Sequence, residues 1–184
     1  MILPPDQMTT ERLILRKPFL EDAATIYEEY ASDPEVTRFL AWQPSPSPDH
    51  VAIFLADALK KWDQKTAFTW ALTMRGKGRL IGMIDARVDA YMVNIGYVLS
   101  RRFWNQGLMT EAVRALIDWT DNEPEIARVW AVCAVQNEAS ARVLEKAGMI
   151  REGILHRWMV FPNLGGKPLD CYCYARVKPV DTSL

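Results

Sequence analysis

The chain has 184 residues, of which 49% are hydrophobic, and its formal net charge at pH 7 is −1. This length and hydrophobic content suit one domain with a substantial core, and they exclude a disordered or fibrous chain. A charge near zero provides no broad positive field, which argues against a dedicated nucleic-acid-binding protein.

The N-terminal stretch MILPPDQMTTERL has neither the basic end nor the long apolar run of a signal peptide. Nowhere do 18 apolar residues run together, as a membrane-spanning helix would require. We therefore expect a single cytoplasmic domain over residues 1–184 with no membrane partner. Its first element is a strand at residues 10–16, TERLILR, which places Leu13 and Leu15 on one face.

Helices follow this strand. Residues 22–30 have a helical composition, and Asp33 before Pro34 predicts a further short turn. Ser47 and Pro48 pair a capping residue with a proline at the first helical position. The helix that they begin has apolar residues at spacings of three and four, which predicts a buried face made of Val51, Leu55, Ala58, Leu59 and Trp62.

A β-hairpin is predicted at residues 68–88, with its turn at residues 76–78. Its glycines are spaced GxGxxxG but join strand to strand, whereas a dinucleotide-binding loop must open a helix. Residues 94–100, NIGYVLS, form the next strand. The helix after Trp104 is expected to bury Leu108, Ala112, Ala115, Leu116 and Trp119.

The remaining elements complete an α/β domain. The apolar run RVWAVCAV at residues 128–135 is typical of a strand covered on both faces. The helix in NEASARVLEKAG has Asn137 as N-cap and Gly148 just past its end. Final strands are expected near residues 153–161 and 169–177, which gives a mixed, twisted sheet of about seven strands with helices on both faces.

The three cysteines, Cys133, Cys171 and Cys173, lie in apolar segments. An odd number in such positions fits reduced core thiols better than a disulfide framework. Cys171 and Cys173 would bind a metal only if two further ligands came near, and His156 is one of two histidines available. Core packing is the favoured explanation.

The stretch FWNQGLMTEA, residues 103–112, begins a helix with a glycine in its first turn, which costs roughly 1 kcal/mol relative to alanine. Asn105 is available as the N-cap. At the positive end of the helix dipole, backbone amides can hold a pyrophosphate, and those expected to do so belong to Gln106, Gly107, Leu108, Met109 and Thr110.

Other side chains of this stretch support the same interpretation. Thr110 can add a hydroxyl donor, and Arg101 and Arg102 can attract phosphate charge. The alternative is that Gly107 only relieves crowding between helix and sheet. The stretch lacks the lysine of a GxxxxGK[ST] loop, which argues against nucleotide hydrolysis.

Four pieces of the chain together resemble the GNAT superfamily of N-acetyltransferases, in particular the RimJ/RimL-like branch similar to the ribosomal-protein N-terminal acetyltransferases. They are TERLILR, IGYVLSRRFWNQGLMTEA, NEASARVLEKAGM, and REGILHR with DCYCYAR. They span almost the whole chain, and their order agrees with that fold. The resemblance implies an acyltransferase that uses acetyl-CoA as co-substrate.

The resemblance also implies a place for each part of this co-substrate. In the family, two neighbouring parallel strands splay apart, here residues 94–100 and 128–135. A bulge in the first strand would leave backbone groups near Val98 and Leu99 free to bond the pantetheine arm. The pyrophosphate would rest on residues 105–110, from Asn105 to Thr110. Asn137 and Ser140 match the family's Asn-x-x-Ser beside the pantetheine and thioester.

The chain departs from the family pattern at three positions. Asn105 replaces a glycine, and Met109 replaces a small residue, so the Met109 side chain must turn away from the phosphates. Leu144 stands where many members have the tyrosine that protonates the departing thiolate. Ser140 is the candidate for hydrogen bonding to the sulfur instead, although Asn137 and Ser140 would also fit a simple helix cap and first turn.

The favoured reaction is direct attack of a neutral amine on the thioester in a ternary complex, helped by positioning and by oxyanion stabilisation. No carboxylate lies in the IGYVLS strand, so the candidates for the base are Asp85, His156, Asp170, Tyr172 and Tyr174. Tyr172, Tyr174 and Arg176 share one strand face, where they would either line an acceptor cleft or be partly buried sheet residues.

The sequence does not identify the acceptor substrate. Residues 39–50, FLAWQPSPSPDH, lie where the family builds its acceptor site, and Trp42 with the prolines would give a rigid wall or simply a loop that starts a helix. A protein N-terminus, a polyamine, an aminoglycoside or another small amine all fit. Neither a monomer nor a homodimer is excluded. A different function class, a non-catalytic acyl-CoA-binding sensor or scaffold, is the alternative.

Overall fold

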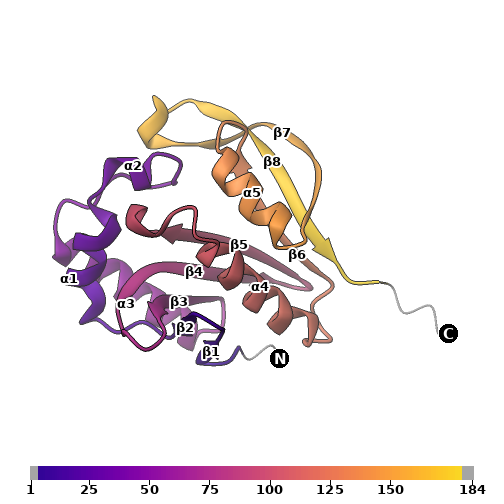
Figure 1. Cartoon of the computed structure of the whole chain (residues 1–184). Helices are drawn as coiled ribbons and strands as arrows, with labels where there is room; N and C mark the ends of the chain where they lie inside the picture. Colours follow the sequence, from indigo (N-terminus) through magenta and orange to yellow (C-terminus); the bar gives the residue numbers. More distant parts are fainter. Residues whose placement is uncertain (1–3, 180–184) are drawn as a thin grey trace.

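Residues 4–179, the part of the chain that the computed structural model describes, form one eight-stranded sheet in the order β1-β2-β3-β4-β5-β6-β8-β7 (Figure 1). Only β5 and β6 run parallel; the other described neighbours are antiparallel. The strands are β1 Gln7–Thr9, β2 Leu13–Arg16, β3 Ala67–Met74, β4 Leu80–Asp89, β5 Met92–Leu99, β6 Arg128–Ala134, β7 Ile150–Val160 and β8 Pro168–Val177.

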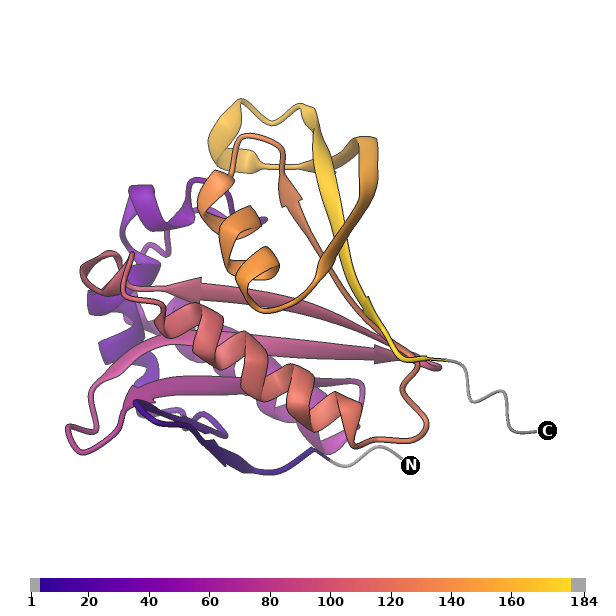
Figure 2. The same ribbon diagram turned by 45° about the vertical axis from the view of Figure 1, so that its right-hand side comes forward.

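Helices cover both faces of this sheet (Figures 1 and 2). α4 (Leu108–Asp121) and α5 (Glu138–Lys146) lie on one face, and α1 (Asp22–Ile26) and α3 (Pro48–Asp63) lie on the other. A short α2 (Pro34–Thr37), a π-helix η1 (Tyr27–Ala31) and the 3₁₀ turns η2 (Arg101–Phe103) and η3 (Pro162–Leu164) complete the fold. The predicted mixed α/β sheet with helices on both faces is confirmed.

Local capping signals fix three of the helix starts. The Asp33 side chain accepts a hydrogen bond from the Glu35 amide at 2.9 Å, and Ser47 Oγ accepts one from the His50 amide at 3.3 Å. Asn137 Oδ1 accepts one from the Ser140 amide at 3.1 Å. Each bond satisfies a first-turn amide that has no partner within its helix. The predicted starts at these positions are therefore confirmed.

The fold differs from the sequence prediction in three details. An eighth strand, β1, pairs with β2, because Gln7–Thr9 is short and mostly exposed and so lacks a buried alternation. The helix expected at residues 22–30 changes to π geometry after Ile26. Leu59 and Ala115, expected to be buried, are only half-buried.

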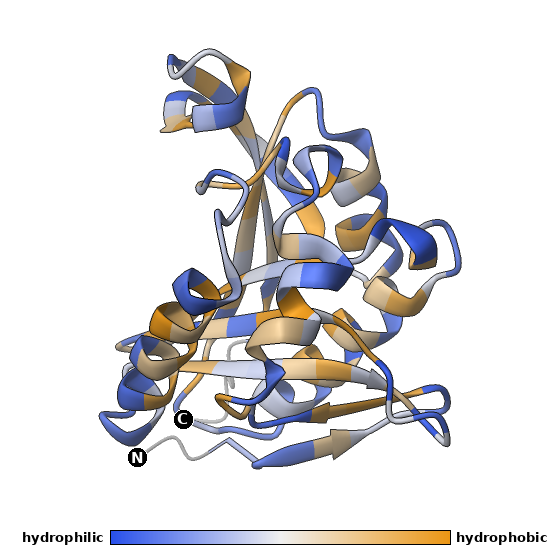
Figure 3. Ribbon diagram, turned by 90° about the vertical axis from the view of Figure 1, so that its left-hand side faces the viewer, coloured by the Kyte–Doolittle hydropathy of each residue, from blue (hydrophilic) through white to orange (hydrophobic). Residues whose placement is uncertain are grey.

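Two buried clusters hold the helices to the sheet. On the α4 face, four large rings pack with centroids 5.1–6.4 Å apart: Trp62, Phe68, Trp70 and Trp119. On the other face, residues of α1 and α3 pack against Ala71 and Met83. Figure 3 shows hydrophobic residues in the strands and on the helices, and hydrophilic residues at several outer turns. In β4, Met83 faces the cluster with α1 and α3, whereas the next residue, Ile84, faces the cluster with α4.

Two further findings concern the described residues. None of the helices in residues 4–179 is both long and apolar enough to cross a membrane. Within the same range the three cysteines are free thiols, with Cys133 and Cys171 buried. Burial raises the pKa of Cys133 to about 11, so this thiol stays protonated at neutral pH.

Candidate functional site

The sheet opens between its two parallel strands. In the described chain, β5 and β6 pair at three positions, from Met92 with Arg128 to Asn94 with Trp130. Beyond Asn94 the strands diverge, although β5 continues to Leu99 and β6 to Ala134. Figure 2 shows the resulting V, with the loop before α4 on the side of its open end. The predicted splay is thus present.

The expected bulge in β5 is absent. Across the described ladder, β4 and β5 stay in register without an extra residue, from Gly82 with Leu99 to Asp89 with Met92. The free edge of β5 arises because β6 turns away from it, and that needs no inserted residue. One group near the expected position is already engaged, because the Leu99 carbonyl accepts a hydrogen bond from Trp104 Nε1 at 2.8 Å.

Gly82 shapes this part of β5. A Cβ at this position would lie 2.3 Å from the Val98 carbonyl oxygen and 3.1 Å from the Leu99 Cα atom, both backbone atoms that cannot swing aside. Only glycine at position 82 leaves room for the Val98 carbonyl oxygen this close to β4. The course of β5 at the two positions predicted to hold a ligand arm therefore depends on a glycine in the neighbouring strand.

We predict that Gly82→Ala destabilises the fold by about 1–3 kcal/mol, as overpacking does, and displaces Val98. Urea unfolding measures the first effect, and titration with acetyl-CoA, the co-substrate that the resemblance implies, measures the second. Gly153→Ala in β7 is the matched control, because no described atom lies within 4 Å of its Cβ position. If the two variants were equally stable, β5 would shift to accommodate the added methyl group at no cost, and the prediction would be wrong.

The N-terminus of α4 carries uncapped amides. In the described chain no side chain caps this helix, and Gly107 is its N-cap residue with φ 74°. The first bond of the helix runs from the Glu111 amide to the Gly107 carbonyl at 3.0 Å. The amides of Leu108, Met109 and Thr110 therefore precede the intrahelical bonds and face the positive end of the dipole. Such a terminus is an anion-binding site.

The glycine of this loop is needed for its backbone angle. Among described atoms, a Cβ on Gly107 would meet only Arg12 Nη2, at an ordinary 3.6 Å, so the alternative of relieved helix–sheet crowding is wrong. Asn105 is not the N-cap either, and it has a left-handed φ of 59°. The Met109 side chain is 5% exposed and packs in the core, as the phosphate interpretation required.

A clamp that the sequence did not predict holds this loop. Arg12 donates to the Gln106 carbonyl at 2.9 Å and to Glu111 Oε2 at 2.7 Å, and the Thr10 hydroxyl donates to Glu111 Oε1. Partial burial raises the pKa of Glu111, but these hydrogen bonds outweigh that effect and the pKa is lowered. An ionised Glu111 thus binds the turn before β2 at Thr10 and Arg12, and Arg12 in turn binds the residue before Gly107.

The two arginines of η2 face acidic side chains. Arg101 Nε lies 3.1 Å from Asp33 Oδ2, and Arg102 Nη1 lies 4.0 Å from Glu29 Oε1. Both remain mostly exposed. Their predicted role, attracting phosphate charge, therefore stays a prediction, and each would have to share its charge with a carboxylate.

Across the V, α5 presents a hydroxyl pair. Ser140 Oγ lies 2.8 Å from the Tyr97 hydroxyl of β5, and Asn137 caps the helix through the Ser140 amide. Burial raises the pKa of Tyr97 strongly, so its phenol is neutral and is available to orient Ser140. Leu144 is fully buried and offers no acid. The cap and the Tyr97–Ser140 pair are compatible, because they use different atoms of Ser140.

Most candidates for the base are engaged elsewhere. His156 Nδ1 lies 2.9 Å from Asp170 Oδ2, and Asp170 also accepts from the Arg157 amide at 2.8 Å, which lowers its pKa. The Tyr174 hydroxyl donates to Glu145 at 2.8 Å, and the residue is fully buried. Tyr174 is therefore a buried sheet residue and does not line a cleft.

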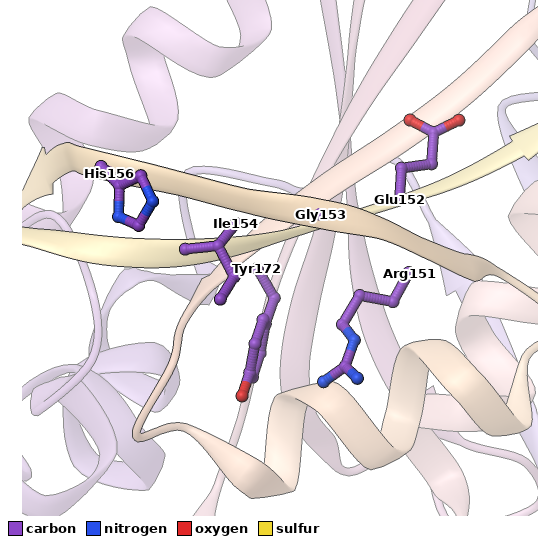
Figure 4. Close-up of a pocket in the computed structure, with 6 residues that line it drawn as sticks. All are labelled: Arg151, Glu152, Gly153, Ile154, His156 and Tyr172. Carbon is purple, nitrogen blue, oxygen red and sulfur yellow. The ribbon is translucent and has the colours of Figure 1, made fainter.

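A pocket of about 540 Å³ lies beside β7 and is lined by Arg151, Glu152, Gly153, Ile154, His156 and Tyr172 (Figure 4). The Arg151 guanidinium stands 4.7 Å from the centre of the Tyr172 ring, and Arg176 pairs with Asp121 of α4 at 2.9 Å. None of the residues predicted to bind acetyl-CoA lines this pocket. Its lining residues belong to β7 and β8.

The loop after α2 is fixed to the β7–β8 connection. Asn163 Nδ2 donates to the Thr37 carbonyl at 2.7 Å and to the Trp42 carbonyl at 2.8 Å. Phe39 packs against a small core that includes Phe161 and Cys171. Residues 39–42 are thus a braced wall near the V and more than a loop that starts α3.

Asp85 differs from the other candidates for the base. It lies on the β4 face opposite α4, its side chain is 23% exposed, and Arg87 Nη2 is 2.8 Å from its Oδ2 atom. It pairs in register with Gly96, which lies in β5 just beyond the last residue paired with β6. The sequence could not place Asp85 here, because the position depends on strand register.

Comparison with known proteins agrees with this geometry. Residues 12–150 match the family described as "Acetyltransferase (GNAT) domain". The "Uncharacterized N-acetyltransferase YoaA" of Bacillus subtilis (strain 168) is 30% identical over 175 residues, or 94% of this chain and 97% of that protein.

Two further proteins show how widely the similarity extends. The "[Ribosomal protein uS5]-alanine N-acetyltransferase" of Escherichia coli (strain K12) is 26% identical over 82% of this chain and 81% of its own length. The crystal structure of the microcin C7 self immunity acetyltransferase MccE with acetyl-CoA and AMP has a TM-score of 0.86. It is 21% identical, covers 96% of this chain and 98% of that one, and so supports the fold alone.

Proposed function

Because the chain belongs to the GNAT family of acetyltransferases and is an N-acetyltransferase with acetyl-CoA as co-substrate, we propose that it acetylates a primary amine by direct attack in a ternary complex. The acceptor is a protein N-terminal α-amine or a small-molecule amine. The observation that carries this proposal is the V between β5 and β6, which opens beside the uncapped amides of α4. Residues 1–184 act as a single domain.

The residues around the V suit a diphosphate that carries an extended, amide-containing arm. The pyrophosphate is assigned to the loop and first turn from Asn105 to Thr110, comprising Asn105, Gln106, Gly107, Leu108, Met109 and Thr110. The arm is assigned to the free edge of β5 at Val98 and Leu99, where backbone groups supply hydrogen bonds as a neighbouring strand would. Asn137 and Ser140 lie on the opposite side of the V.

Ser140 is assigned the catalytic hydrogen bond to the thioester sulfur. Its hydroxyl is held by neutral Tyr97, and no acid is available from Leu144. Acetyl-CoA supplies the activated acetyl group when bound. The protein's own contribution is to hold the two reactants together, to exclude water and to place donors where charge develops.

The test is a paired measurement on the purified chain. Calorimetry with coenzyme A and with acetyl-CoA should show saturable binding, and free thiol should appear only when an acceptor is added. The acceptor panel contains peptides with a free α-amine, the same peptides with a blocked α-amine, and small amines. Binding of acetyl-CoA without thiol release for any acceptor would favour a sensor. If neither coenzyme A nor acetyl-CoA gave binding heat, the proposed site would be wrong.

A further inference from the structure

We propose that the Asp85 carboxylate accepts the proton of the attacking amine. This inference rests on the proposed function, and it names the one group that the reaction needs and that the sequence left unassigned.

The register puts Asp85 at the point where the V begins. Asn94 is the last β5 residue that pairs with β6, and Gly96, two residues on, is the register partner of Asp85. Ile84 and Ala86 belong to the core on the α4 face, so Asp85 lies on the opposite face. A ligand arm that follows β5 from the α4 loop ends beside this carboxylate, on the face that also carries the braced wall of residues 39–42.

Gly96 gives the carboxylate its position over β5. A Cβ on Gly96 would stand 2.7 Å from Asp85 Oδ1, so the oxygen occupies space that any other residue would fill. The Gly96 backbone is extended and has no positive φ, so conformation alone does not call for glycine here. The absent side chain therefore serves the carboxylate.

Polar neighbours orient the partly buried carboxylate of Asp85. Arg87 Nη2 is 2.8 Å from Oδ2, and Arg87 Nη1 donates to Asn94 Oδ1 at 2.9 Å. These two interactions fix the Oδ2 atom of Asp85, and its Oδ1 atom points toward Gly96. Arg87 and Asn94 are accordingly positioning residues, because they act on the amine only through Asp85.

The environment also makes Asp85 a better base than an ordinary carboxylate. Burial raises its pKa to about 6, although Arg87 and Lys61 of α3 both oppose this shift. The Lys61 charge is itself paired with Asp57, 2.6 Å away. A carboxylate with this pKa is ionised at neutral pH yet binds a proton readily, which suits general-base catalysis.

The proposed step balances without any further reactant. The amine nitrogen forms a bond to the thioester carbonyl carbon while its proton passes to Asp85, directly or through one water. The carbon–sulfur bond breaks, and its electron pair leaves on sulfur as a thiolate. Ser140 stabilises this thiolate by a hydrogen bond, and the thiolate takes up a proton from solvent. Asp85 then returns its proton to solvent. The net products are the N-acetylated amine and coenzyme A.

The test compares Asp85→Asn with Asp89→Asn, an exposed carboxylate at the end of the same strand. We expect Asp85→Asn to lower kcat at least 100-fold, to leave acetyl-CoA affinity within about 2-fold, and to abolish the loss of kcat near pH 6. Asp85→Glu should recover part of the rate, and Gly96→Ala, which displaces Oδ1, should lose about 10-fold. Asp89→Asn should match the wild type.

The pH dependence of unfolding gives a readout independent of turnover. The pKa of Asp85 is higher in the folded than in the unfolded chain, so its contribution to stability is greatest below about pH 4 and is lost as pH rises through about 6. Asp85→Asn should therefore be as stable as the wild type or more so at pH 7.5, and lose this relative advantage on acidification.

The outcomes separate the two ideas. If the wild type binds acetyl-CoA but no acceptor releases thiol, the proposed function fails and the role of Asp85 falls with it. If the wild type acetylates an amine and Asp85→Asn keeps the same kcat and pH profile, only the inference about Asp85 is overturned. An unchanged pH dependence of unfolding would also overturn it, since the carboxylate would then not be desolvated.

Discussion

Gly107→Pro should weaken coenzyme A binding by about 100-fold or more while the fold persists. Proline fixes φ near −65°, whereas Gly107 has φ 74°, so the substitution must turn the peptide groups that precede α4. The amides of Leu108 to Thr110 would no longer converge on one anion. Loss of two charge-assisted hydrogen bonds, each worth about 1.5–3 kcal/mol, accounts for that magnitude.

The control for this variant is Gly76→Pro. Gly76 has φ 76° and lies in the exposed β3–β4 turn, where no described atom approaches within 4 Å of its Cβ position. Both variants strain a left-handed position, but only Gly107→Pro alters the loop that is proposed to hold the pyrophosphate. Calorimetry and thermal unfolding should show similar stability losses and very different affinities. A folded Gly107→Pro protein that binds coenzyme A normally would remove the phosphate role from this loop.

The elements predictable from sequence are those with local causes. Asp33, Ser47 and Asn137 each cap a helix through an amide only two or three residues away, so short windows of sequence suffice. The amphipathic spacing in α3 and α4 likewise identifies their buried faces. The glycine at the start of the helix after Trp104 is also a local signal, and it indicates an unusual backbone at Gly107.

Features that depend on strand register could not be predicted in this way. The clamp on the α4 loop joins Arg12 to Glu111, 99 positions along the chain. Asp85 meets Gly96 only because β4 and β5 pair in that register, and a shift of one residue would turn Asp85 into the opposite core. The missing bulge is a similar case, because the divergence of β6 exposes the edge of β5 without one.

The clamp also explains why the loop can keep two left-handed residues. These are Asn105, with φ 59°, and Gly107, with φ 74°. A non-glycine residue such as Asn105 is strained at this angle unless its surroundings hold it. Arg12 holds the Gln106 carbonyl, and Glu111 holds Arg12 from the first turn of α4. The loop is therefore preorganised, which lowers the entropy lost when an anion binds.

Ser140→Ala should lower kcat by about 10- to 100-fold and leave the affinity for acetyl-CoA nearly unchanged. The hydroxyl is proposed to act on sulfur as the carbon–sulfur bond breaks, so its loss affects the transition state more than the ground state. The cap is preserved, because Asn137 bonds the Ser140 amide and alanine retains that amide. Alanine is also the better helix former, so the variant should be no less stable.

Tyr97→Phe separates chemistry from packing in this pair. It removes the hydroxyl that lies 2.8 Å from Ser140 Oγ but keeps the ring, so a smaller fall in kcat is expected if Tyr97 only orients Ser140. The double variant should then be no slower than Ser140→Ala alone, because residues that act through one another are not additive. If the two single variants lower kcat independently, Tyr97 itself reaches the sulfur. If kcat is unchanged in Ser140→Ala, Ser140 has only a structural role in the first turn of α5.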